Sequence, residues 1–67
     1  MSEVKKHQFK ISFDKEARKG LPQWLMIDQL NNQVNTRLGK DKWYATHYHS
    51  REENDGGLTF IVEVEEI

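Results

Sequence analysis

Apolar and polar residues alternate along residues 7–13. The apolar positions are Phe9, Ile11 and Phe13, and the residues between them are Gln8, Lys10 and Ser12. Successive side chains of a strand point to opposite faces, so this alternation predicts a strand with one face buried. Residues 14–20 are mostly charged and predict a connection with room for one helical turn.

The next apolar pattern has the period of a helix and extends over residues 21–38. Pro22 suits a first helical turn, where its missing N–H is not needed, and Gly39 suits the left-handed residue that ends a helix. One apolar stripe is predicted along this helix, formed by Ile27, Leu30, Val34 and Leu38. The first turns also carry apolar residues opposite this stripe or at its margin, namely Leu21, Leu25 and Met26.

Two further strands are predicted over residues 42–51 and 58–66. The first is rich in aromatic and β-branched residues. The second alternates, and its apolar face consists of Leu58, Phe60, Val62 and Val64. Between the strands, Glu-Asn-Asp-Gly-Gly over residues 53–57 predicts a hairpin turn in which Gly56 has a positive φ.

The length of this turn determines which side of the strand over residues 42–51 is buried. A three-residue loop over residues 54–56 fits a type I turn followed by a left-handed glycine. The pairs that it predicts are Tyr48 with Val62 and Thr46 with Val64. The core face then gains Tyr44 and Tyr48, and the outer face carries Trp43, Ala45, His47, His49 and Ile61. A loop of two or four residues would exchange the two sets and bury both histidines.

These elements predict an α+β fold with a single domain over residues 1–67. We expect a three-stranded antiparallel sheet with the strands in the order 2-3-1 and one helix packed on one face. The other face would carry Trp43, Ala45 and Ile61, which is too apolar to lie in water. This face and the apolar start of the helix both predict a second contact surface, so we expect self-association or a bound partner.

Composition favours the same expectation. The chain has 67 residues and no cysteine, so a thin core is not reinforced by disulfides or by thiolate metal sites. Oligomerisation is the reinforcement that remains, and a homodimer is its simplest form. The longest apolar run, residues 24–27, is far shorter than the ~20 residues of a membrane span. The N-terminus lacks an apolar signal stretch, so we expect a cytoplasmic protein without membrane contact.

Two histidines are candidate metal ligands. His47 and His49 point to the same side of a strand, so both could contact one metal ion, with His7 or Glu63 as a further ligand. Only the pair is local in the sequence, and His47 lies opposite Glu63 in the register above, which is an ordinary cross-strand polar pair. We therefore assign no metal and no cofactor.

A nucleic-acid interface and a catalytic site are both weakly indicated. The residues that would stack on bases and contact phosphates are Trp43, His47, His49, Lys40 and Lys42. The net charge of −1 and the acidic strand over residues 58–66 argue against that interface. The sequence has no nucleophile elbow and no glycine-rich phosphate loop. The carboxylate pairs, Glu52–Glu53 and Glu65–Glu66, consist of adjacent strand residues that point to opposite faces. We expect that the protein is not an enzyme.

The order strand, helix, strand, strand, with Trp43 near the start of the second strand, resembles the dodecin family of flavin-binding proteins. A tryptophan at that place stacks on the flavin in the family, so the resemblance implies a small-ligand carrier in which Trp43 stacks on an aromatic ligand. The chain departs from the family in its longer charged connection, in Pro22 and in its Asn- and Gln-rich helix. The resemblance is one of form, which does not by itself carry function.

The leading hypothesis is a small, non-enzymatic, homodimeric protein-binding module that docks on a larger protein and inhibits or regulates it. Accessory proteins of phages and mobile elements are often of this kind. The alternatives are the ligand carrier and a nucleic-acid binder. The surface predicted for self-association consists either of Trp43, Ala45 and Ile61 on the open sheet face or of Leu21, Leu25 and Met26 at the start of the helix. The set that is not used for self-association is the predicted partner surface. Charged residues would set specificity and on-rate, among them Lys5, Lys6, Glu63 and Glu65.

Overall fold

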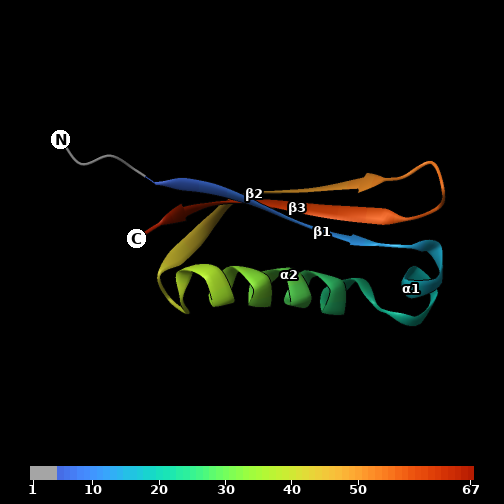
Figure 1. The fold of residues 1–67 in the computed structure, drawn as a ribbon, viewed down its shortest axis with the longest axis horizontal. Helices are drawn as coiled ribbons and strands as arrows, with labels where there is room; N and C mark the ends of the chain where they lie inside the picture. The colour runs from blue at the N-terminus through green and yellow to red at the C-terminus, as the bar shows by residue number, and fades with distance from the viewer. Residues whose placement is uncertain (1–4) are drawn as a thin grey trace.

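The computed structural model describes residues 5–67. Within these residues the elements are β1 (Lys6–Phe13), α1 (Lys15–Gly20), α2 (Gln23–Leu38), β2 (Trp43–Glu52) and β3 (Leu58–Glu66). The strands form an antiparallel sheet in the order β1-β3-β2, and α2 runs along one face of it (Figure 1). The predicted α+β fold and strand order are therefore confirmed.

The short helix α1 is an addition to the single helix that the sequence predicts. Asp14 caps it, because its Oδ1 accepts a hydrogen bond from the Ala17 N–H at 2.7 Å. The Leu21 N–H donates to the Ala17 carbonyl at 3.1 Å and the backbone at Leu21 is extended. As a result α2 begins at Gln23 rather than at Leu21, and Pro22 is its N-cap. Gly39 ends α2 with φ 103°, as predicted.

The core lies between α2 and the sheet. Leu30 and Val34 are fully buried, and Met26 exposes 3% of its surface. These residues pack with a set from β1 and β3, namely Phe9, Phe13, Phe60, Val62 and Val64. Met26 rather than Ile27 is buried at the first position of the predicted stripe, and Ile27 packs half-buried beside it. The two residues precede Leu30 by four and three positions, and both spacings bring a side chain onto the same helix face, so the periodicity does not distinguish them.

A β-bulge in β2 changes the predicted register at one end of the sheet. Tyr48 pairs with Val62 as predicted, but Ala45 rather than Thr46 lies opposite Val64. Thr46 is the extra residue, and its hydroxyl donates to a main-chain carbonyl of β3 at 3.0 Å. A bulge adds one residue to one strand only, so every residue beyond it changes face relative to an unbroken alternation.

Because of the bulge, the predicted faces of the first residues of β2 are wrong. Trp43 and Ala45, which are predicted on the outer face, turn toward α2 and pack half-buried against the core. The Trp43 Nε1–H donates to Asn35 Oδ1 of α2 at 2.7 Å, so the half-buried indole has a partner for its polar atom. Tyr44, which is predicted in the core, lies opposite Glu65 on the outer face.

The hairpin between β2 and β3 has the predicted three-residue loop. The Gly56 N–H donates to the Glu53 carbonyl at 3.0 Å, and the Glu53 N–H donates to the Gly57 carbonyl at 2.9 Å. Gly56 has φ 90°, which a residue without a Cβ adopts readily. Because the loop has this length, His47 and His49 lie on the outer face, as predicted.

Replacement of a core side chain should destabilise the protein far more than replacement of an exposed one. We expect Leu30→Ala to lower the free energy of unfolding by about 2–5 kcal/mol, because a cavity forms where Leu30 has no exposed surface. Trp24→Ala is the control, since Trp24 exposes 70% of its surface, and we expect a change below about 1 kcal/mol. Urea denaturation measures both values, and equal losses would contradict the position of the core.

Candidate functional site

The outer face of the sheet carries a histidine–glutamate cluster. His47 lies opposite Glu63, as predicted, and His49 Nε2 is 3.2 Å from Glu63 Oε2. The two imidazole rings are nearly parallel, with centroids 6.0 Å apart. An open hollow of about 470 Å³ lies beside them, with a lining that includes Lys6, Gln8, Thr46, His47 and Glu65. The Glu63 carboxylate therefore contacts one of two stacked histidines, and the other histidine lines a polar hollow.

This cluster is not arranged as a metal centre. Within residues 5–67, no group of three or more His, Cys, Asp or Glu side chains is placed to hold a metal ion. His49 contacts the Glu63 carboxylate, while His47 Nδ1 lies 3.4 Å from the hydroxyl of its neighbour Thr46. The two rings thus make separate contacts instead of converging on one point.

A second set of polar residues on the outer face lies next to the histidines and consists of Tyr44, Glu65 and Lys6. The Tyr44 hydroxyl donates to Glu65 Oε2 at 2.6 Å. This hydrogen bond, together with desolvation and the negative charge of Glu65, raises the pKa of Tyr44. Lys6 of β1 lies opposite Glu65 on its other side. The carboxylate is therefore placed between a cation and a hydroxyl donor.

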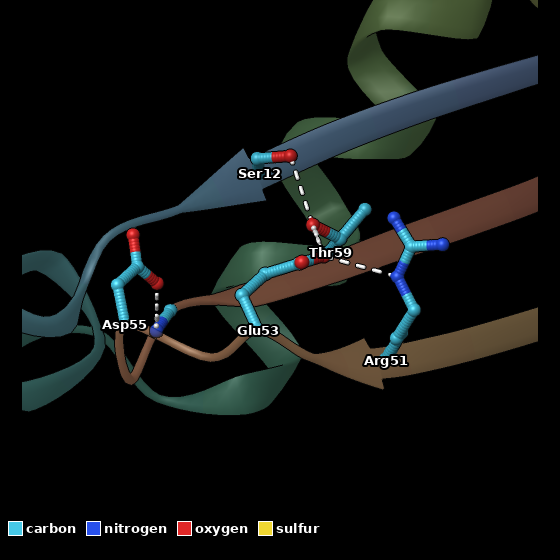
Figure 2. Close-up of polar contacts among 6 residues, drawn as sticks. Ser12, Arg51, Glu53, Asp55 and Thr59 are labelled. Carbon is cyan, nitrogen blue, oxygen red and sulfur yellow. Dashed lines mark hydrogen bonds and ion pairs between the residues drawn. The ribbon is translucent and has the colours of Figure 1, made fainter.

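A chain of hydrogen bonds crosses all three strands near the hairpin (Figure 2). Thr59 Oγ1 donates to Glu53 Oε1 at 2.9 Å, and Arg51 Nε donates to the same oxygen at 3.0 Å. Ser12 Oγ lies 2.9 Å from Thr59 Oγ1, and because the Thr59 proton is directed at Glu53, Ser12 is the donor. The hydrogen bonds from Thr59 and then Arg51 lower the pKa of Glu53.

This chain fastens the hairpin rather than preparing a hydroxyl for reaction. Thr59 exposes only 3% of its surface, so its hydroxyl is not offered to a substrate. Activation of a hydroxyl needs a base that is free to take its proton. Glu53 already accepts hydrogen bonds from Thr59 and Arg51. Asp55 Oδ1 accepts the Gly57 N–H at 2.9 Å and fixes the loop itself.

Neither predicted set of surface residues lies together on one exposed face. Met26 is in the core, and Trp43 and Ala45 pack beneath the sheet on the side of α2. The remaining three are half-buried, and they are Leu21, Leu25 and Ile61. Leu21 packs against the core, and Ile61 lies on the outer face opposite Lys10 and His49.

Trp24 is the apolar residue that the predicted surface omits. It lies in the first turn of α2 and exposes 70% of its surface. It lies about 120° around the helix from Leu30 and about 60° from the half-buried Ile27, which is the edge of the stripe. That edge position is the only signal of it in the sequence, because Leu25 lies farther from Leu30 around the helix and is nevertheless half-buried.

β2 is an open edge of the sheet. Among the described residues it pairs only with β3, and eight of its ten residues are exposed. The helix α2 packs on β1 and β3, and β2 is the strand farthest from it at the hairpin end (Figure 1). Tyr48 faces the helix side but is half exposed, and its hydroxyl donates to Asn31 Oδ1 at 2.9 Å.

Comparison of the chain with models of known protein families, with curated proteins and with solved structures found no match. Across residues 5–67, neither helix has the length and apolar character that crossing a membrane requires.

The Glu53 contacts predict a pH dependence of stability. A carboxyl whose pKa is lowered by folding stabilises the protein above its unfolded pKa, near 4.5, and this contribution is lost as the pH falls through the lower folded pKa. We expect Glu53→Gln to be less stable than the wild type around pH 7, and the difference to shrink below pH 4.5. Urea denaturation over that range measures it.

Glu16→Gln is the matched control, because Glu16 contacts only the Lys19 ammonium, at 3.8 Å on the exposed helix α1. Its effect around pH 7 should be smaller than that of Glu53→Gln. A Glu53→Gln difference that is constant across the acid range would contradict the assigned role of the carboxylate.

Proposed function

We propose that the protein is a non-enzymatic protein-binding module that docks on a larger protein through the start of α2 and inhibits or regulates it. The observation that carries the proposal is the exposure of Trp24, whose indole lies 70% in solvent in the first turn of that helix. Leu25 is adjacent and half-buried, so an apolar contact is available at the same end of the helix.

An exposed tryptophan is a favourable anchor for another protein. Its large ring buries much apolar area at little cost in side-chain entropy, and its N–H can still find an acceptor. Tryptophan is accordingly enriched among the residues that dominate interface energies. Trp24 lies outside the core cluster of the fold, so this residue is available for binding without loss of the core.

The other two functions considered have less support. A ligand carrier requires an accessible face of Trp43, whereas this indole packs half-buried toward α2 and donates to Asn35. A nucleic-acid platform requires a basic sheet face, whereas Glu63 and Glu65 share the outer face with the histidines. A role as an accessory protein of a phage or mobile element remains part of the proposal.

The proposal predicts that one charged substitution removes partner binding without unfolding the protein. We expect Trp24→Lys to weaken capture of the partner at least about tenfold, because a buried hot-spot aromatic is replaced by a charge. The partner would be captured from a lysate of the source cells, identified by mass spectrometry and then titrated in purified form. Gln33→Lys is the matched control, since residue 33 is also exposed on α2.

A change in the unfolding free energy below about 1 kcal/mol would show that Trp24→Lys is folded. Fluorescence gives an independent readout, because Trp43→Phe leaves Trp24 as the single tryptophan. Its emission should shift to shorter wavelength when the partner buries it. Equal capture by the wild type and Trp24→Lys would rule out this surface.

A further inference from the structure

The open edge of β2 presents the main-chain groups of alternate residues. The Glu53 N–H donates to the Gly57 carbonyl, so Glu53 belongs to a hydrogen-bonded pair of the hairpin. Such pairs alternate with non-bonded pairs along antiparallel strands. Glu52, Ser50 and Tyr48 therefore direct their N–H and C=O groups away from β3, toward the edge.

Beyond Thr46 this edge has none of the lysines, prolines and bulges that commonly prevent strand addition. Lysines, prolines and bulges protect most edge strands. The other edge strand, β1, carries Lys6 and Lys10 and packs against both helices. β2 has no lysine and no proline, and its one bulge lies at Thr46. Residues 47–52 therefore form an unbroken and exposed strand segment that is open to another strand, and Glu53 continues its main-chain ladder into the hairpin.

We propose that two copies of this chain pair antiparallel along β2, with Ser50 of each copy on the two-fold axis. The inference deepens the proposed function and rests on it, because it assigns the self-association of the module to a surface other than Trp24. The product is a continuous six-stranded sheet with β2 and its copy at the centre. The axis is perpendicular to the sheet, so both α2 helices lie on the same side of it.

The alternation of faces limits the possible registers. Paired residues of two antiparallel strands have their side chains on the same face, so the axis must pass through a residue and not between two residues. The candidate centres are Tyr48, His49, Ser50 and Arg51. Only the centre at Ser50 pairs residues 47–53 with the same segment of the copy. Centres at Tyr48 and His49 extend the pairing into the bulge, where the faces no longer match, and a centre at Arg51 shortens the pairing to residues 49–53 and places the two Arg51 side chains opposite each other.

The polar side chains of the edge favour the same centre. With Ser50 on the axis, His47 of each copy lies beside the partner's Glu53 on the outer face. His49 lies beside the partner's Arg51, and each of these already contacts a carboxylate of its own chain, at 3.2 Å and 3.0 Å. A centre at His49 would instead place His47 beside the partner's Arg51 and add no carboxylate. An imidazole and a carboxylate directly across two strands form a favourable polar pair.

Two further features fit this register. Ser50 has a small side chain, so the two copies meet on the axis without a clash. Tyr48, Ser50 and Glu52 are the residues whose main-chain groups point outward, and in this register they pair with one another. The pairing then forms about six main-chain hydrogen bonds between the copies.

Single cysteines test the register directly, because the chain has none of its own. In the proposed dimer the Cα atoms of the two residues at position 50 are about 5.5 Å apart, within the range of a disulfide. We expect Ser50→Cys to form a covalent dimer under mild oxidation. Tyr48→Cys and Glu52→Cys should each fail to do so alone but should cross-link when mixed. Rapid cross-linking of Tyr48→Cys alone, or none by Ser50→Cys, would overturn the register.

Two separate proline substitutions test whether the edge of β2 forms the dimer. Ser50→Pro removes an outward N–H of β2 and leaves the ladder with β3 intact. Gln8→Pro is the matched control, because the Glu66 N–H donates to the Lys5 carbonyl and the alternation places the Gln8 N–H outward on β1. We expect Ser50→Pro to lower the association constant at least about tenfold, and Gln8→Pro to change it by less than about threefold. Sedimentation equilibrium would measure both.

These experiments separate the inference from the proposed function. A wild-type protein that stays at the 8.0 kDa mass of one chain overturns the inference, even where Trp24 still governs partner capture. Loss of capture in Ser50→Pro with a monomeric wild type would assign the edge to a strand of another protein, which also overturns it. A dimer that depends on Ser50 and captures nothing through Trp24 supports the inference and fails the proposed function alone.

Discussion

A helix with its side chains is about 10 Å wide and neighbouring strands lie about 4.8 Å apart, so one helix covers about two strands of a sheet. In this protein α2 covers β1 and β3, where Leu30 and Val34 meet Phe9 and Val62. Most of β2 therefore lies beyond the layer that the helix provides. The composition of this strand, its irregular register and its exposed edge all follow from that limit.

The strand β2, which the helix leaves mostly uncovered, is held by contacts at its two ends. At its start the bulge turns Trp43 toward α2, where the indole packs on the core and donates to Asn35. At its end Glu53 accepts hydrogen bonds from Thr59 and Arg51, and Ser12 extends this chain to β1 (Figure 2). Between the ends, the Tyr48 hydroxyl reaches α2 through Asn31. The middle of β2 is thus fixed by polar contacts and by its hydrogen-bond ladder with β3. The strand edge that faces away from β3 remains open.

The sequence predicts the elements whose signal is local. The alternation in residues 7–13 and 58–66 gave both strands, and the Asn-Asp-Gly loop gave the register of the hairpin, including Tyr48 opposite Val62. It does not predict the bulge, because the decisive interactions are the Thr46 hydroxyl with a carbonyl of β3 and the Trp43 indole with Asn35, both between distant segments. Periodicity also does not distinguish Met26 from Ile27, since both lie within one turn of Leu30 on the same face.

The predicted surface residues show the same division between local and distant signals. The alternation that predicts Trp43 and Ala45 on the outer face is interrupted by the bulge. The position of Trp24 at the edge of the helix stripe follows from the sequence, whereas its exposure beside the half-buried Leu25 depends on how α2 packs. The edge of β2 follows from the strand order, whereas its exposure depends on which two strands α2 covers.

The extra residue at Thr46 affects both the core and the open edge of β2. An unbroken β2 would leave Trp43 on the outer face and extend a regular edge along the whole strand. The extra residue at Thr46 instead buries the indole and divides the edge into an irregular start and a regular second part. Irregularity protects the first part against strand addition, while the second part keeps alternating main-chain groups and charges of both signs. A chain with so small a core thus uses one residue to enlarge that core, and the same residue confines strand pairing to a segment that can fit only a few registers.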